Sequence, residues 1–237
     1  GRSGHGGDVS VVSGRSDALS SGSFAAGTAD GPQSGGVSLR SGAASAASSG
    51  RVLVSTGDAS SDAGGLSLLA GSSLSSAGGH VTVSSGAGEM NGGVLSLMSG
   101  AGQIAGGIVD VRSGGGVTDS SGAVLIASNS GLDSGEVGIT SGHGDVGSSG
   151  NVKVGTGQST SKRSGSVSVS TGKALHHSGG TLALSGGKSA SQAHQGGSLE
   201  ATAGNGARGG LVDIASGGGS QGTGGDIGLT AGDGSGG

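Results

Sequence analysis

The sequence contains no cysteine, tryptophan or tyrosine, and it has one phenylalanine and one proline among 237 residues. The absence of cysteine excludes disulfide bonds and thiol chemistry without fixing the cellular compartment. The near-absence of aromatic residues removes the side chains that usually dominate a hydrophobic core and that stack on nucleic-acid bases. The scarcity of proline, with glycine at irregular intervals, excludes a collagen triple helix.

Charge and long apolar runs are also scarce. The chain has 11 Lys plus Arg residues, which are scattered, and a net charge of −4, so we expect no nucleic-acid partner. The longest apolar runs are about four or five residues, against the roughly 20 that a membrane-spanning helix needs, so we expect no membrane insertion. No signal-peptide pattern is present and the chain begins Gly-Arg-Ser, which predicts a mature or excised segment.

What the sequence does contain is 62 glycines, with much serine and alanine, arranged in a repeat. Each copy reads Gly, one variable residue, then apolar–x–apolar–x–small, then Gly. Sixteen copies follow one another at roughly 14.5 residues each. A disordered Gly/Ser linker has no reason to keep such a spacing. The apolar positions are Val9/Val11, Phe24 (a degenerate copy), Val37/Leu39, Val52/Val54, Leu66/Leu68, Val81/Val83, Leu95/Leu97, Val109/Val111, Val124/Ile126, Val137/Ile139, Val152/Val154, Val167/Val169, Leu182/Leu184, Leu199/Ala201, Val212/Ile214 and Ile227/Leu229.

Apolar residues two apart, with Val and Ile frequent, predict short strands. Connections of about eight residues fit hairpins poorly, whereas identical strands at a fixed period fit a coil whose turns stack on one another. We therefore predict an all-β protein: residues 1–237 form one continuous parallel β-solenoid of about eight coils of roughly 29 residues, each holding two strand–turn repeats. A coil of one repeat is the alternative. The larger coil is favoured by Ser or Thr before the small position in most even copies, as at Ser55, Ser84 and Thr140.

The small position and its neighbour suggest a defined turn. The third inward residue is nearly always small, and glycine follows it except in the ninth copy, where Asn129 stands. Asparagine is the non-glycine residue that best tolerates the left-handed conformation, so we predict a positive φ at this position. Several connections also carry one central apolar residue, such as Leu74, Ile104 or Leu132, and we expect these to plug the ends of a flattened core.

The solenoid has no terminal cap in the sequence. The repeat is already in phase at Gly7 and still running at Gly232, with no polar capping element or helix. An exposed terminal coil would be an open edge that templates association. We therefore predict that the chain is a segment of a longer rod or fibre, or that it stacks end to end with other copies.

Matches to catalytic and binding motifs are at the level of chance. Gly142–Gly147 and Gly204–Gly209 fit GxGxxG, but about four such matches are expected at this glycine content, and neither lies between a strand and a helix. Gly218–Gly222 imitates a nucleophile elbow without a His or Asp partner. Histidines and carboxylates follow no column of the repeat. We predict no enzyme: no catalytic residue, no cofactor-binding residue and no metal-binding residue. The histidines are His5, His80, His143, His176, His177 and His194.

In broad character, the glycine- and serine-rich repeat resembles the parallel β-solenoid repeats of extracellular fibre and cell-surface proteins. The resemblance spans the whole chain and concerns architecture, with no single family implied. It implies a structural protein: the shaft of an extracellular filament, surface appendage or fibre, formed by coil stacking and end-to-end association. Its expected partners are other copies of itself, by end-to-end or lateral contact, and other fibre or cell-surface components. The expected location is extracellular or at a cell or virion surface.

Two other functions stay open at this level. One is an ice-binding or other surface-binding, adhesive solenoid. An ice-binding face would need a flat array of outward threonines, and Leu53, Asp110 and Lys153 interrupt that column. A solenoid enzyme acting on polysaccharides would need clustered carboxylates, arginine and aromatic residues. The absence of aromatic residues argues against it.

Overall fold

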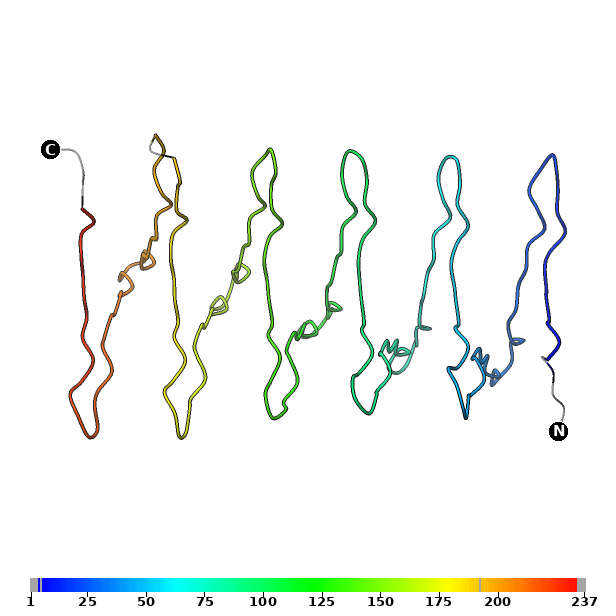
Figure 1. Ribbon diagram of the computed structural model, residues 1–237, viewed down its shortest axis with the longest axis horizontal. Helices are drawn as coiled ribbons and strands as arrows, with labels where there is room; N and C mark the ends of the chain where they lie inside the picture. The colour runs from blue at the N-terminus through cyan, green and yellow to red at the C-terminus, as the bar shows by residue number, and fades with distance from the viewer. Residues whose placement is uncertain (1–3, 5, 192, 234–237) are drawn as a thin grey trace. The chain divides into compact units, whose positions relative to one another are not determined.

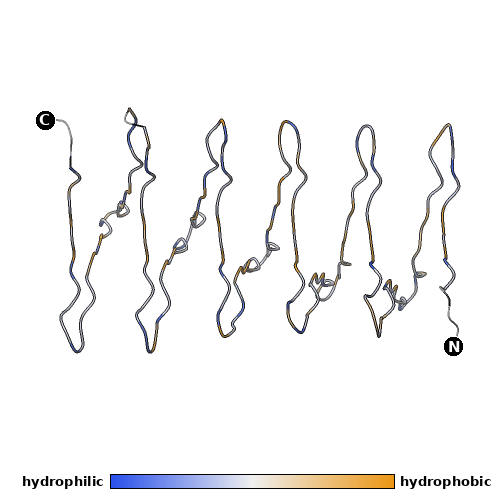
Figure 2. Cartoon of the chain, in the orientation of Figure 1, coloured by the Kyte–Doolittle hydropathy of each residue, from blue (hydrophilic) through white to orange (hydrophobic). Residues whose placement is uncertain are grey.

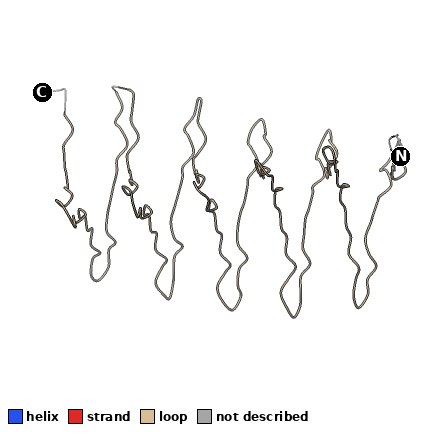
Figure 3. Cartoon of the chain, turned by 60° about the horizontal axis from the view of Figure 1, so that its bottom comes forward, coloured by secondary structure: helices blue, strands red, loops and turns tan. Residues whose placement is uncertain are grey.

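The computed structural model describes residue 4 and residues 6–191 and 193–233. No helix and no β-strand occurs anywhere in these residues, and Figure 1 accordingly draws the chain without a coiled ribbon or an arrow. Coloured by secondary structure, the chain is loop throughout this part (Figure 3). The predicted all-β fold, a parallel β-solenoid of eight coils, is therefore wrong.

The missing element is the hydrogen-bond ladder between segments. A parallel sheet requires regularly spaced N–H···O=C bonds from each strand to the next. Among the described residues, the backbone–backbone hydrogen bonds instead join pairs of glycines within one connection, and none links two apolar segments. Within each unit, the repeat therefore brings no two described segments into register by backbone hydrogen bonds.

Burial is absent as well. The chain exposes 23857 Å², whereas a folded monomer of 21.3 kDa exposes about 9,000 Å² and its unfolded chain about 31,000 Å². No described residue is buried, whether apolar, polar or charged. Two medium-sized apolar side chains per repeat bury too little surface to offset the conformational entropy lost on ordering, especially with so many glycines. This imbalance explains why periodicity alone does not give a core.

The repeat nevertheless organises the chain locally. Straight runs alternate with reversals and bends in Figure 1, and Figure 2 shows hydrophobic residues along the straight runs. We call the stretch from the first to the second apolar residue of a copy an apolar segment. From Val109 to Val154, the paired apolar side chains that begin and end each segment are 46% to 76% exposed, and the first of each pair is the more covered. The central apolar residues of the intervening connections, Val117, Leu132 and Val146, are fully exposed.

The central apolar residues of the connections do not plug a core. Leu74, Ile104 and Leu132 lie fully in solvent, with Leu132 at 108% exposure. The sequence-based prediction for these residues is wrong, because it presupposed a flattened interior that the chain does not form. Their apolar surface is left unpartnered.

The contacts of the chain fall into two units, Gly1–Arg112 and Ser113–Gly237. Within each unit the construction is the same, with apolar segments joined by glycine-closed connections. In the part of the chain that the structure describes, no helix has the length and apolar character needed to cross a membrane.

Candidate functional site

The best-defined local feature is the point where a connection leaves one apolar segment and enters the next, which we call the loop neck. At eight necks, the N–H of a closing glycine donates to the carbonyl of the glycine that follows the small position, at 2.8 or 2.9 Å. The connection between the two glycines is thereby closed like a compact surface loop. The pairs, closing glycine first, are Gly22/Gly14, Gly79/Gly71, Gly93/Gly86, Gly107/Gly100, Gly122/Gly114, Gly197/Gly187, Gly210/Gly204 and Gly225/Gly217.

The neck explains why the third position of the repeat is small. A Cβ built on Gly107 would lie 3.2 Å from the Cβ of Ser99, and one built on Gly79 would lie 3.2 Å from the Cβ of Ala70. The small residue and the closing glycine thus face each other across the neck. Ser41, Ser113 and Ala203, which are small-position residues, are among the few described residues that are half-buried.

Threonine closes two necks with its side chain. The hydroxyl of Thr156 donates to the carbonyl oxygen of Gly165 at 3.3 Å, and the hydroxyl of Thr28 donates to that of Gly35 at 3.2 Å. Thr28 therefore takes the small position in the degenerate copy, which the sequence pattern alone did not identify. Ala29 follows it, so glycine is missing after the small position here as well as at Asn129. Both contacts replace the glycine-to-glycine bond with a side-chain bond across the same gap.

The predicted positive φ is wrong. No described residue has a positive φ, whether glycine or not. The glycine after the small position, such as Gly71 or Gly100, has open space where its Cβ would be. Its carbonyl accepts the neck bond, and it is the closing glycine whose missing side chain the neck requires. Asn129 uses its Oδ1 to accept the Ser130 N–H at 2.9 Å.

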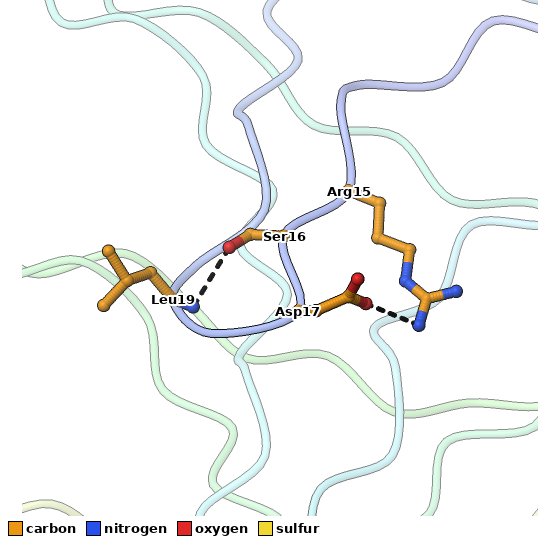
Figure 4. A network of polar contacts seen from close by, with 4 residues as sticks. All are labelled: Arg15, Ser16, Asp17 and Leu19. Carbon is orange, nitrogen blue, oxygen red and sulfur yellow. Dashed lines mark hydrogen bonds and ion pairs between the residues drawn. The ribbon is translucent and has the colours of Figure 1, made fainter.

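Inside the loops, the backbone turns through glycines and short hydroxyl contacts. A Cβ on Gly88 would collide with the carbonyl of Asn91, and one on Gly102 with the carbonyl of Ala105. In the first loop, Ser16 Oγ accepts the Leu19 N–H at 3.0 Å, a local bond typical of serine in turns (Figure 4).

The same view shows that no interior forms in this loop. Arg15 and Asp17 make an exposed ion pair of 2.6 Å, and the Leu19 side chain points away from it (Figure 4). Exposed pairs of this kind contribute little to stability.

Ionisable groups do not gather into a site. In the described residues, no group of three His, Cys, Asp or Glu side chains could hold a metal ion. His143 lies 3.6 Å from Asp145 in one loop, and His194 Nδ1 lies 3.0 Å from Ser191 Oγ in another. His5 lies outside the described residues. The pairs are local and exposed, and no third group completes either of them.

The glycine motifs that imitate nucleotide-binding loops also have a structural role. In Gly142–Gly147, a Cβ on Gly144 would lie 2.5 Å from the carbonyl oxygen of Gly147, so glycine is needed there for the bend itself. In Gly204–Gly209, Gly204 accepts the neck bond from Gly210. An open concavity of about 480 Å³ lies at another neck, between Arg40 and Ser49, and no buried polar group faces it.

No family model, no curated protein and no solved structure matches the chain. Function must therefore be inferred from the repeat and its geometry. The feature shared by the copies is an exposed apolar segment between loop necks. This repeated apolar segment is the candidate interaction surface.

Proposed function

We propose that this chain is a structural repeat protein that assembles with further copies of itself, as the shaft of an extracellular filament, surface appendage or fibre. One observation carries the proposal: the apolar pairs recur through the chain, and every one of them is exposed. Apolar surface on this scale marks an interaction surface, because its removal from water is favourable. An isolated chain provides no other way to cover it.

The composition supports association between copies. With a net charge of −4 over 237 residues, electrostatic repulsion between chains is weak. Glycine, serine and alanine are short, so backbones can approach closely. The extracellular or surface location, and the participation of other fibre or cell-surface components, belong to the same proposal.

Filament formation is tested by electron microscopy and sedimentation velocity of the purified chain at neutral pH over a concentration series. We expect dispersed chains at low concentration and uniform filaments above a threshold concentration. Chains that remain monomeric at the highest soluble concentration would show that self-assembly is not the function.

The threshold should also depend on pH. The isoelectric point of the sequence is near 5.8, so lowering the pH from 7 towards 5.8 removes the net negative charge and with it the repulsion between copies. We expect the threshold concentration, measured by sedimentation, to fall over this interval. If the threshold concentration instead rises as the pH approaches 5.8, repulsion between like-charged copies is not the electrostatic effect that sets it.

No observation favours the ice-binding alternative. That function requires a flat, regular face, and the described residues contain no sheet on which such a face could form. The proposed function therefore stays with self-assembly.

A further inference from the structure

In the apolar segments, exposed apolar side chains and unpaired backbone groups occur at the same residues. Their side chains are exposed, and their backbone N–H and C=O groups take part in none of the hydrogen bonds between described residues. Unpaired backbone groups along a straight run are a template for pairing with another chain. A partner that adds as a strand would satisfy the backbone groups and cover the apolar side chains together.

The alternation of side chains suits such a partner. Asp110 and Arg112, two residues apart, form an ion pair of 2.8 Å. In an extended run, residues two apart share a face, so Val109 and Val111 lie on the opposite face. The segment therefore has one polar face and one apolar face, as a half-buried strand does.

We infer that the partner is a second copy of this chain, whose apolar segments pair as strands with those of the first. The inference rests on the proposed function and specifies its contacts. Another copy fits because it repeats the same segments at the same spacing, so that one pairing brings the next pair of segments into reach. It also carries few charges of either sign.

Much surface of the chain is left for contacts with other copies. The chain exposes about 15,000 Å² more than a folded monomer of its mass, whereas a stable interface needs about 800 Å² from each partner. The loop necks keep the connections closed on themselves and thus outside the paired segments. The segments pair between copies, while the loops stay in solvent.

Proline substitutions test the backbone contribution without removing an apolar side chain. Proline lacks the N–H that a strand with a neighbour on each edge uses. The segment variant combines Ser38→Pro, Ser67→Pro, Ser96→Pro and Ser168→Pro, each between the two apolar residues of a copy. The matched loop variant combines Ser45→Pro, Ser61→Pro, Ser148→Pro and Ser161→Pro.

Fibre diffraction and sedimentation give the decisive outcomes. We expect filaments of the unchanged chain to give a reflection near 4.7–4.8 Å. We also expect the segment variant to raise the threshold concentration at least about tenfold, since each substitution removes one backbone hydrogen bond from the pairing, while the loop variant stays within about twofold. If filaments form without that reflection and both variants assemble alike, strand pairing is overturned while the proposed function stands. If the unchanged chain never assembles, the proposed function itself fails.

Trypsin gives an independent readout on the same filaments. We expect assembly to protect Lys153, which lies within an apolar segment, and Arg51 and Arg112, which lie directly beside one, and to leave the loop sites Arg163 and Arg208 open to cleavage. Equal cleavage at both groups of sites in assembled protein would contradict pairing through the apolar segments.

Discussion

Replacing the second apolar residue by serine in four successive copies is expected to abolish filament assembly at concentrations where the unchanged chain assembles. The variant carries Val111→Ser, Ile126→Ser, Ile139→Ser and Val154→Ser, whose side chains are 66% to 76% exposed in the isolated chain. Burying each in an assembly contributes about 1–2 kcal/mol, so the four together contribute at least about 4 kcal/mol. A loss of that size raises the threshold concentration about a thousandfold, which sedimentation measures directly.

The matched control changes four loop residues of similar size: Ile104→Ser, Val117→Ser, Leu132→Ser and Val146→Ser. These side chains are fully exposed. Each lies in a loop next to one of the four segments, and the loops of Ile104 and Val117 are also closed by a neck bond. Because the control removes comparable apolar surface, it separates a general loss of hydrophobicity from loss of the segment contacts. A threshold raised equally by both variants would show that the segments have no special part in assembly.

Gly107→Val is expected to open its loop neck. The added Cβ lies 3.2 Å from the Cβ of Ser99 and 3.5 Å from the Gly100 carbonyl oxygen, and the further methyl groups of valine crowd the bond from Gly107 to Gly100. Losing a bond worth about 0.5–1.5 kcal/mol lowers the closed population about two- to tenfold. Amide hydrogen exchange at residue 107, with a distance measurement by paired dyes across the loop, reports the change.

Gly100→Val is the corresponding control on the other side of the same neck. A Cβ on Gly100 meets open space, and the substitution keeps the carbonyl that accepts the bond. We expect exchange at residue 107 to stay within about twofold of the unchanged chain. Equal opening of the neck by both substitutions would mean that steric fit between Ser99 and Gly107 does not hold it closed.

The sequence predicted the local pattern of the chain better than its fold. Apolar spacing correctly marks the segments that lie between loops, and the glycines mark the necks where those loops close. Periodicity shows which residues share a face, but it does not show whether the same chain covers that face. A strand needs a partner, and the partner is not encoded in the spacing of one segment.

The prediction of a positive φ after the small residue is wrong for a related reason. Glycine after the small residue, together with Asn129, suggested a left-handed residue, yet φ is not positive at any described position. The constraint acts instead across the neck, between Ala70 and Gly79 for example, nine residues apart. A contact between residues so far apart is invisible to a pattern based on neighbours. The recurrence of glycine two residues before the apolar pair was the signal that could have identified it.

The described residues of the isolated chain form no strand, and we propose that the apolar segments are completed only by other copies. Amide hydrogen exchange of the dilute monomer, read at Val111, Ile126 and Ile139, tests this most directly. We predict exchange near the rate of an unfolded chain in the monomer, and strong protection of the same amides once filaments form. Strong protection of these amides in a verified monomer, lost in one cooperative unfolding transition, would contradict the account.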